Sequence, residues 1–441
     1  MRIASVSIFN ARFLSVSPVF VGALVFCLGL LSGNTISTRL HDAPDLLMEV
    51  TEPSRLDAIR AKISHDFDLE EQIAQLMAIG YLGGADANLE QTGVVQHVVG
   101  RVQQGINLYN PAHEAEAYLI DLEGNQLHRW ALPLEQAFPD GEPATEITRY
   151  WRRVRLLDDG GLLAIYEGVG VVRIDRDSQL IWSNKNGAHH DLDFTHEGQV
   201  ATLRRKLHIN PEIHPSEPVL EDFIELLDPQ TGESLETFSV YDAFAQSSHA
   251  SAIIARADSG DVFHTNTLQV LDGTLADAIP AFARGNYLIS MRSISVIAVI
   301  DAKSKRVVWS MAGQWKHQHE PQVLANGNLL IFDNSGNGRW SKVIEFDPRT
   351  QEIYWAYYGT PENEFHSKTL GSQQRLANGN TLITETTAGR VREISAQGEE
   401  VWRFHSPHVL QADDPREPRT TARICEMLRV EPNTDFLRSL L

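Results

Sequence analysis

A repeated strand, turn and strand unit constrains the fold of this chain more than any other feature of its sequence. Six segments share an apolar strand, a turn centred on Asp in all copies except the last, and a second strand that ends in Trp in five of them. The segments are AYLIDLEGNQLHRW, VVRIDRDSQLIW, FIELLDPQTGESLETF, VIAVIDAKSKRVVW, KVIEFDPRTQEIYW and VREISAQGEEVW, with turn residues Asp121, Asp175, Asp228, Asp301, Asp347 and Ser395 and terminal Trp130, Trp182, Trp309, Trp355 and Trp402. Successive turns lie roughly 50 residues apart, a period typical of propeller blades.

A second hairpin recurs between most of these segments. VLANGNLLIFDN and RLANGNTLITET are its clearest copies, and LLDDGGLLAIYE and FTHEGQVATLRR are looser ones. Their Asn-Gly and Asp-Gly pairs supply the positive φ that a tight hairpin turn requires. Two hairpins per unit make four strands, so the sequence predicts an all-β fold, a six-bladed β-propeller of four-stranded blades. We interpret the Trp residues as large anchors that pack one blade on the next.

Counting back from the turn glycines of the second hairpins brings a set of polar residues into register. Eight residues before Gly160, Gly198, Gly327 and Gly379 stand Arg152, His190, His319 and Gly371, and nine residues before Gly273 stands His264. Equivalent positions of a closed radial repeat share one radius and one height. If this position begins the innermost strand, three histidines and an arginine converge on the axial channel, the usual concave site of such a ring.

Several stretches of the chain resemble the bacterial arylsulfotransferases, which work without a nucleotide sulfate donor. They are DVFHTN, NYLISMR and VVWSMAGQWKHQHEPQVLANGNLLIFDN, while GINLYNPAHEAEAYLIDLEGNQLHRW and AHHDLDF are similar to the early blades of the same family. The resemblance covers about Gly93 to His408. It implies a six-bladed propeller and a ping-pong reaction in which a channel histidine becomes transiently sulfurylated. The expected activity is transfer of a sulfuryl group from an aryl sulfate donor to a phenolic acceptor.

The resemblance also implies roles for individual residues. His319, in QHEPQVLANGN, is the candidate nucleophile. His264 and Asn266 of HTN, with Arg292 of ISMR, match the sulfuryl-binding groups of the family. Thr387, in TTAG, resembles a contact residue of the last blade.

Two of these assignments leave neighbours to weigh. The HHD segment supplies another active-site histidine, which the register assigns to His190 rather than His189. His317 is the alternative to His319, because residues two apart share a face of a strand. The register and the family-like Gln-His pair both favour His319. A lysine that the family can carry beside the last-blade threonine is Thr386 here, and the cysteine pair of some members is missing, which leaves proton handling and acceptor choice open.

The chemistry requires these residue types. A neutral imidazole attacks sulfur near pH 7 and leaves well afterwards, so one difficult transfer becomes two easier ones. Fixed donors such as Arg292 and Asn266 stabilise charge on the sulfuryl oxygens and the departing phenolate. Either His264 or His190 can serve as the general acid and base for the phenol, and the sequence does not decide between them.

Charge and composition exclude several other classes of function. The formal net charge of −20 is spread along the chain, whereas a nucleic-acid partner requires a basic footprint. No P-loop or dinucleotide fingerprint occurs, so we expect no cofactor. Three histidines are adequate zinc or copper ligands, but Arg292 in the same cavity would repel a cation, and we expect no metal. The main alternative is a non-catalytic propeller that binds a small anionic ligand or a protein partner.

The N-terminus carries a targeting pattern. Arg2 and Arg12 precede an apolar run from Phe13 to about Leu31, and no acidic residue occurs before Asp42. This pattern favours an uncleaved single-pass anchor over a removed signal peptide, with the catalytic domain on the extracytoplasmic, periplasmic side in either case. The predicted domains are therefore a signal anchor and linker at 1–43, a helical stalk at 44–92 and the propeller with a C-terminal tail at 93–441. Aryl sulfates, phenols and the membrane are the expected partners, and the sequence leaves a homodimer open.

Overall fold

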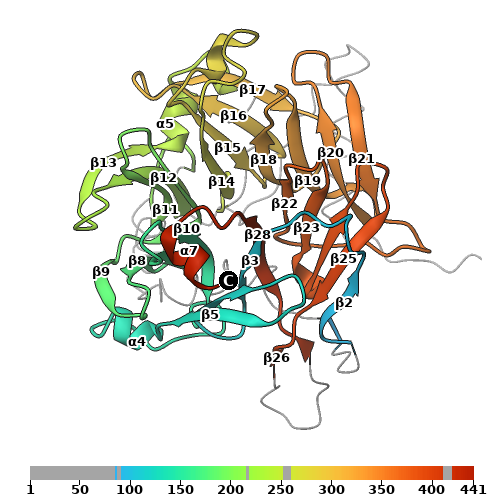
Figure 1. The fold of residues 1–441 in the computed structure, drawn as a ribbon. Coiled ribbons are helices and arrows are strands. Elements are labelled where there is room, and N and C mark those ends of the chain that lie inside the picture. Colours follow the sequence, from blue (N-terminus) through green and yellow to red (C-terminus); the bar gives the residue numbers. More distant parts are fainter. Residues whose placement is uncertain (1–84, 87–90, 215–217, 252–259, 411–419) are drawn as a thin grey trace, which may run out of the picture. The chain divides into compact units, whose positions relative to one another are not determined.

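The strands form six blades around a central axis in the computed structural model, which describes residues 85–86, 91–214, 218–251, 260–410 and 420–441 (Figure 1). Every blade is an antiparallel sheet, and its strands are named here from the axis outward. The first blade contains β28 (Ile424–Val430), β3 (Ile106–Pro111), β4 (Glu116–Ile120) and β5 (Gln126–Ala131). The second contains β6 (Trp151–Leu156), β7 (Leu162–Tyr166), β8 (Gly170–Ile174) and β9 (Leu180–Asn184). The third contains β10 (Ala188–Phe194), β11 (Val200–His208), β12 (Val219–Leu227) and β13 (Ser234–Ser239).

The other three blades complete the ring. The fourth contains β14 (Thr265–Val270), β15 (Tyr287–Met291), β16 (Val296–Ile300) and β17 (Val307–Ala312). The fifth contains β18 (His319–Val323), β19 (Leu329–Asn337), β20 (Trp340–Phe346) and β21 (Ile353–Tyr358). The sixth contains β22 (Ser372–Arg375), β23 (Thr381–Glu385), β24 (Arg390–Ile394), β25 (Glu400–His405) and, outermost, β2 (Gly93–His97). The predicted six-bladed propeller is therefore confirmed.

The two kinds of hairpin have the places that the repeat assigns to them. The six turn segments connect the third and fourth strands of each blade, and the second hairpins connect the first and second strands. The first blade lacks a copy of the second hairpin because its innermost strand, β28, comes from the C-terminal end of the described chain. The sixth blade differs from the predicted four strands, since β2 pairs with β25 as a fifth strand. Strands from both ends of the propeller segment thus complete the two blades at the junction, β28 in the first blade and β2 in the sixth.

The hydrophobic core is divided into clusters that lie between neighbouring blades. One cluster joins the third and fourth blades, another the first and second, and a third the first and sixth. The terminal Trp residues contribute to this packing, as predicted. Trp130 Nε1 donates to the backbone oxygen of Gly160 in the next blade at 3.1 Å, and Trp402 Nε1 donates to that of Leu122 at 2.9 Å. Trp182 bonds the following blade in the same way.

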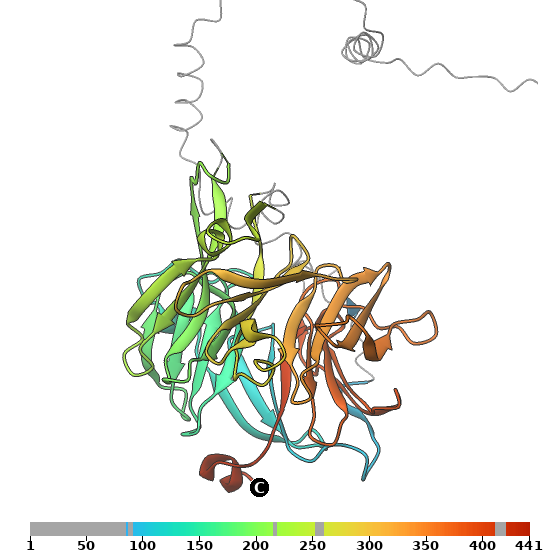
Figure 2. The same cartoon turned by 90° about the horizontal axis from the view of Figure 1, so that it is seen from above.

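Few helices accompany the strands. They are α4 (Leu134–Ala137), α5 (Val240–Ala245), α7 (Asp435–Ser439) and the 3₁₀ turns η1 (Pro280–Phe282) and η2 (Thr386–Ala388). Figure 2 shows α7 beyond one end of the ring, where Phe436 packs on Trp130 and against Gly160. A small sheet of β1 (Ala85–Asp86), β27 (Thr420–Thr421) and β26 (Val409–Leu410) is separate from the blades.

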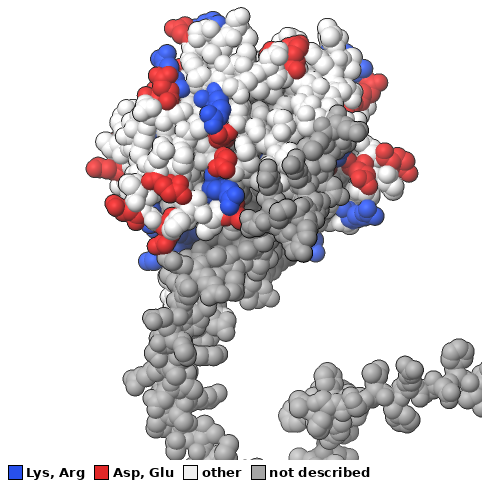
Figure 3. Space-filling model, turned by 90° about the horizontal axis from the view of Figure 1, so that it is seen from below, with Lys and Arg blue, Asp and Glu red and all other residues white. Residues whose placement is uncertain are grey.

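The predicted anchor at 1–43 and nearly all of the predicted stalk at 44–92 lie outside the described residues. Among the residues that are described, no helix combines the length and the apolar character needed to cross a membrane. On the face shown in Figure 3, acidic and basic side chains are interspersed over the described surface, so the net negative charge is not gathered there into one patch.

Candidate active site

The residues that the turn glycines bring into register stand where the innermost strands begin. Arg152 is the second residue of β6, His190 lies in β10, and His319 opens β18. His264 and Gly371 immediately precede β14 and β22. We call these five the register residues. Because the blades repeat around one axis, the register residues share one end of the channel.

Breaks in strand pairing at this same place turn the side chains toward the axis. The register between the first and second strands shifts at Arg152 in the second blade, at His190 in the third, at Asn266 in the fourth and just after His319 in the fifth. His190 and His264 also have left-handed φ values of 55° and 51°. A bulge redirects a side chain without breaking the sheet, and bulges concentrate beside active sites for that reason.

The three predicted histidines are gathered at the axis. The rings of His190 and His264 meet edge to face with centroids 4.9 Å apart. The charges of Arg292 and Arg152 both act on His319, and that of Arg292 has the larger effect. Burial, followed by Arg292, holds the pKa of His319 well below its ordinary value, and burial followed by Arg152 does the same for the pKa of His190. Both imidazoles are therefore neutral near pH 7.

The hydrogen bonds of His319 assign its tautomer. Nδ1 lies 2.8 Å from Oδ1 of Asn334 and 3.1 Å from the backbone oxygen of His317. The amide of Asn334 cannot be reversed, because its Nδ2 donates at 2.7 Å to the backbone oxygens of Ser367 and Leu370. Both neighbours of the imidazole Nδ1 are therefore acceptors, and Nδ1 carries the hydrogen. The lone pair is therefore on Nε2, which is the ring atom that could act as a nucleophile in this tautomer.

His264 has a different partner. Its Nδ1 donates to the carboxylate of Asp261, three residues earlier. A carboxylate stabilises an imidazolium, whereas the amide beside His319 does not. The two rings are thus held in different electrostatic environments, with an amide beside His319 and a carboxylate beside His264.

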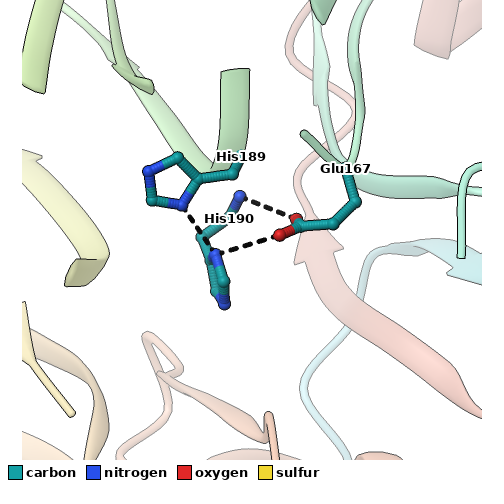
Figure 4. A group of neighbouring side chains, drawn as sticks. All are labelled: Glu167, His189 and His190. Carbon is teal, nitrogen blue, oxygen red and sulfur yellow. Dashed lines mark hydrogen bonds and ion pairs between the residues drawn. The ribbon is translucent and has the colours of Figure 1, made fainter. Parts of the chain in front are cut away.

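His189 and His190 form a group with Glu167, which Figure 4 shows. The two Nδ1 atoms lie 2.8 Å apart, and Nδ1 of His190 lies 3.3 Å from Oε1 of Glu167. Glu167 also accepts from the backbone N–H of His190 at 3.1 Å. His189 extends away from the axis, where its Nε2 lies 3.4 Å from Asp222. Of the two histidines, only His190 has a ring contact with His264, in line with the register assignment.

This same group has atoms close enough to hold a metal ion, since one ligand atom from each residue falls within 4.8 Å of the others. Its surroundings oppose a cation. Glu167 accepts a hydrogen bond from Arg205 at 2.7 Å, and Nε of Arg152 lies 4.0 Å from the same carboxylate. Two guanidinium groups at this distance repel a metal ion, and the carboxylate already has partners. The donor set fits a hydrogen-bonded support for His190 better than a metal centre.

The remaining predicted residues occupy the same end of the channel or its wall. Arg292 follows β15, and its backbone N–H donates to the backbone oxygen of His264 at 3.1 Å. Among the described residues, its guanidinium has no hydrogen-bond or ion-pair partner. Asn266 is fully buried and donates from Nδ2 to the backbone oxygen of Gln318 at 2.9 Å, which fixes the residue before His319. Thr387 bonds the backbone oxygen of His366 at 3.3 Å. No contact among the described residues joins Thr387 to His190, His264 or His319.

His317 is set apart from His319 by its backbone. It precedes β18 and has a left-handed φ of 58°, so strand alternation does not apply to it. Gln318 between them is fully buried, and its Nε2 donates to the backbone oxygens of Met291 and Val296. The histidines outside the register have local partners: His249 bonds Ser310, His405 bonds the backbone of Gln91, and His408 bonds Tyr109.

A layer of ion pairs closes the axis next to the histidines. Arg153 is buried, bonds the carboxylates of Glu320 and Glu426, and lies 3.1 Å from that of Asp191. Arg155 bonds Asp191 and Glu426 as well. These residues come from four blades, so the layer ties the ring together. A cavity of about 790 Å³ borders this layer, but no histidine lines it, and it is distinct from the candidate active site.

The sequence analysis named Arg292 and Thr386 from the family resemblance but missed the rest of a second set of site residues, although the same turn glycines indicate them. The position seven residues after the turn glycine lies in or just after each second strand, beside the register residue of its own blade. These positions hold Glu167, Arg205, Arg292, Asn334 and Thr386, with Gly285 as the glycine of the longer hairpin in the fourth blade. Thr386, the residue that replaces a family lysine, accepts from the backbone N–H of Gly371 at 3.1 Å. Asp261 and Arg153 have no such signal.

Comparisons with known proteins give a family match for the chain. The family model described as arylsulfotransferase (ASST) matches residues 153–407. Among solved structures, a protein of unknown function from Bacteroides caccae is 13% identical over 73% of this chain and 98% of its own, with a TM-score of 0.43. The β-propeller domain of Cps50 (Swd1) from Myceliophteria thermophila is 9% identical over 71% and 89%, also with a TM-score of 0.43. No curated protein matches the chain.

Proposed function

The chain belongs to the arylsulfotransferase (ASST) family, and we propose that it transfers a sulfuryl group from an aryl sulfate to a phenol through a sulfohistidine, without a nucleotide donor. The observation that carries this proposal is the environment of His319. Its Nδ1 hydrogen is committed to Asn334, its Nε2 is unprotonated, and its low pKa keeps the ring neutral.

In the first half-reaction, Nε2 of His319 attacks sulfur. The N–S bond forms as the S–O bond to the aryl group breaks, and the electron pair of that bond remains on the phenolate oxygen. The sulfurylated ring develops positive charge, which the hydrogen bond from Nδ1–H to Asn334 Oδ1 stabilises. Arg292, a flanking cation whose guanidinium has no hydrogen-bond or ion-pair partner in the described part of the chain, is placed to bind the sulfuryl oxygens.

The second half-reaction returns the enzyme to its starting state. His264, whose Nδ1 bonds Asp261, gives a proton to the departing phenolate and then takes one back from the acceptor phenol. The acceptor oxygen attacks sulfur, the N–S bond breaks, and His319 is regenerated in its original tautomer. His190 is less suited to the proton, because burial and Arg152 lower its pKa well below the usual value.

A direct test looks for the intermediate. The purified protein is incubated with 4-nitrophenyl sulfate without acceptor and analysed by intact-protein mass spectrometry. We expect one sulfuryl adduct in the wild type and in His317→Ala, and none in His319→Ala. His317→Ala is a matched control two residues away. An adduct that persists in His319→Ala would refute the assignment of the nucleophile. If the wild type neither forms an adduct nor transfers sulfate, the alternative of a non-catalytic propeller that binds a ligand would be favoured.

We also propose that residues 1–43 anchor the protein in the cell membrane as a single span, with the propeller on the extracytoplasmic, periplasmic side. The support is the basic N-terminus followed by the long apolar run. Protease treatment of intact spheroplasts is the test. We expect the propeller to be digested or released from outside, while resistance in intact spheroplasts and digestion after lysis would contradict this orientation.

A further inference from the structure

Two successive arginines on β6 have opposite surroundings. Arg153 binds the carboxylates of Glu320 and Glu426 and lies beside Asp191. Arg152 is 2% exposed, yet among the described residues its guanidinium forms no hydrogen bond, and its Nε is a buried nitrogen without a partner. Its one ion pair there is a loose one, with 4.0 Å between its Nε and Glu167.

The nearest carboxylate is already committed to other donors. Oε1 of Glu167 accepts from Arg205 at 2.7 Å, and Oε2 accepts from the backbone N–H of His190 at 3.1 Å. Arg152 therefore cannot be explained as a structural ion pair of the kind that Arg153 makes. A buried guanidinium without hydrogen bonds is costly, and such groups in native proteins call for a ligand or another functional reason. An anion that arrives with the substrate would supply the missing partner.

The order of the blades indicates which anion this is. Around the axis the innermost strands follow one another as β28, β6, β10, β14, β18 and β22. The second blade, with Arg152, therefore lies across the ring from the fifth blade, with His319. Arg292 comes from the fourth blade, directly beside the nucleophile. Two guanidinium groups thus approach the reacting centre from different directions.

Displacement at sulfur is in line, so the departing oxygen lies on the side of sulfur opposite the attacking nitrogen. With the nitrogen supplied from the fifth blade, the phenolate oxygen points toward the second blade. We propose that Arg152 is a catalytic residue that binds this oxygen, as the departing phenolate in the first half-reaction and as the attacking phenol oxygen in the second. The inference rests on the proposed function and assigns the sulfuryl oxygens and the phenol oxygen to separate arginines, Arg292 and Arg152.

The test uses the dependence of rate on the leaving group. A series of 4-substituted phenyl sulfates, from 4-nitrophenyl to 4-methylphenyl, is assayed with wild type, Arg152→Met and Arg292→Met. Removing a charge donor to a developing oxyanion costs on the order of 100-fold in rate. We expect Arg152→Met to lose about that factor with the poorest leaving group and roughly 10-fold or less with the best, since less negative charge collects on a 4-nitrophenolate oxygen. Arg292→Met should slow the whole series by a similar factor.

The melting temperature distinguishes a binding role of Arg152 from a structural one, because removing a structural arginine would lower it. Because Arg152 has no hydrogen bond and only a loose ion pair among the described residues, Arg152→Met should melt at or above the wild-type temperature. The inference fails if the wild type is active but its rate depends on the leaving group in the same way as that of Arg152→Met. It also fails if Arg152→Met melts clearly below the wild type. Either result leaves the proposed function intact. Wild type without any sulfuryl transfer would overturn the proposed function, and the inference with it.

Discussion

Replacing Arg153 with Met tests whether the ion pairs at the axis hold the blades together. The side chain is about 1% exposed and faces Asp191, Glu320 and Glu426, which come from three other blades. Met fills a similar volume but leaves three carboxylates buried together. Removing one partner of a buried ion pair costs about 3–5 kcal/mol. With an unfolding entropy of about 2.1 cal/mol/K per residue over roughly 350 ordered residues, this cost corresponds to a fall in Tm of about 4–7 °C.

The loss should depend on pH in a direction that follows from proton binding. Without Arg153, the clustered carboxylates bind protons more readily in the folded protein than in the unfolded chain, so their folded-state pKa values are raised. Burial already raises the pKa of Glu320 in the wild type. Stability gained by protonation is present at low pH and is lost as pH rises. The Tm difference between wild type and Arg153→Met should therefore widen from about pH 5 to about pH 8.

The assay is thermal unfolding followed by circular dichroism in matched buffers, with Arg349→Met as control. Arg349 pairs with Asp347 on an exposed turn, where an ion pair contributes little, and its removal should leave Tm essentially unchanged. Equal Tm values for wild type and Arg153→Met, or a difference that narrows as pH rises, would refute the reasoning. In that case the layer would be a polar filling of the channel without a role in stability.

Three further outcomes are expected. Gly371→Ala should lower the free energy of unfolding by about 1–3 kcal/mol in urea titrations, because φ is +99° and the added Cβ would lie 2.6 Å from the ring of Phe332; an unchanged midpoint would contradict this. Asp261→Asn should slow turnover of phenyl sulfate about 100-fold by removing the carboxylate that supports His264, while undiminished turnover would exclude the proton role. The rate of sulfuryl adduct formation should not fall between about pH 8 and pH 6, because the depressed pKa of His319 keeps the ring neutral, and a midpoint near 6.5 would show an ordinary imidazole instead.

The sequence by itself determined the architecture and the place of the site. A strand repeat with a period near 50 residues in four of its five intervals predicts a closed ring, and equivalent positions in a ring lie at one radius. That is why His190, His264 and His319 could be assigned to one end of the axis from their distances to turn glycines. The same counting in the forward direction, over seven residues, would also have indicated Glu167, Arg205 and Asn334.

The tertiary structure alone decided the surroundings of each of these residues. Arg153 and Arg152 are adjacent and identical in the sequence, yet Arg153 has three carboxylates around it and Arg152 has no hydrogen bond within the described part of the chain. Asn334 places an amide beside His319, whereas Asp261 places a carboxylate beside His264. Such differences arise from bulges and from contacts between blades far apart in the chain. Local sequence pattern fixes which residues reach the axis, whereas charge, tautomer and available lone pairs depend on the partners that folding brings there.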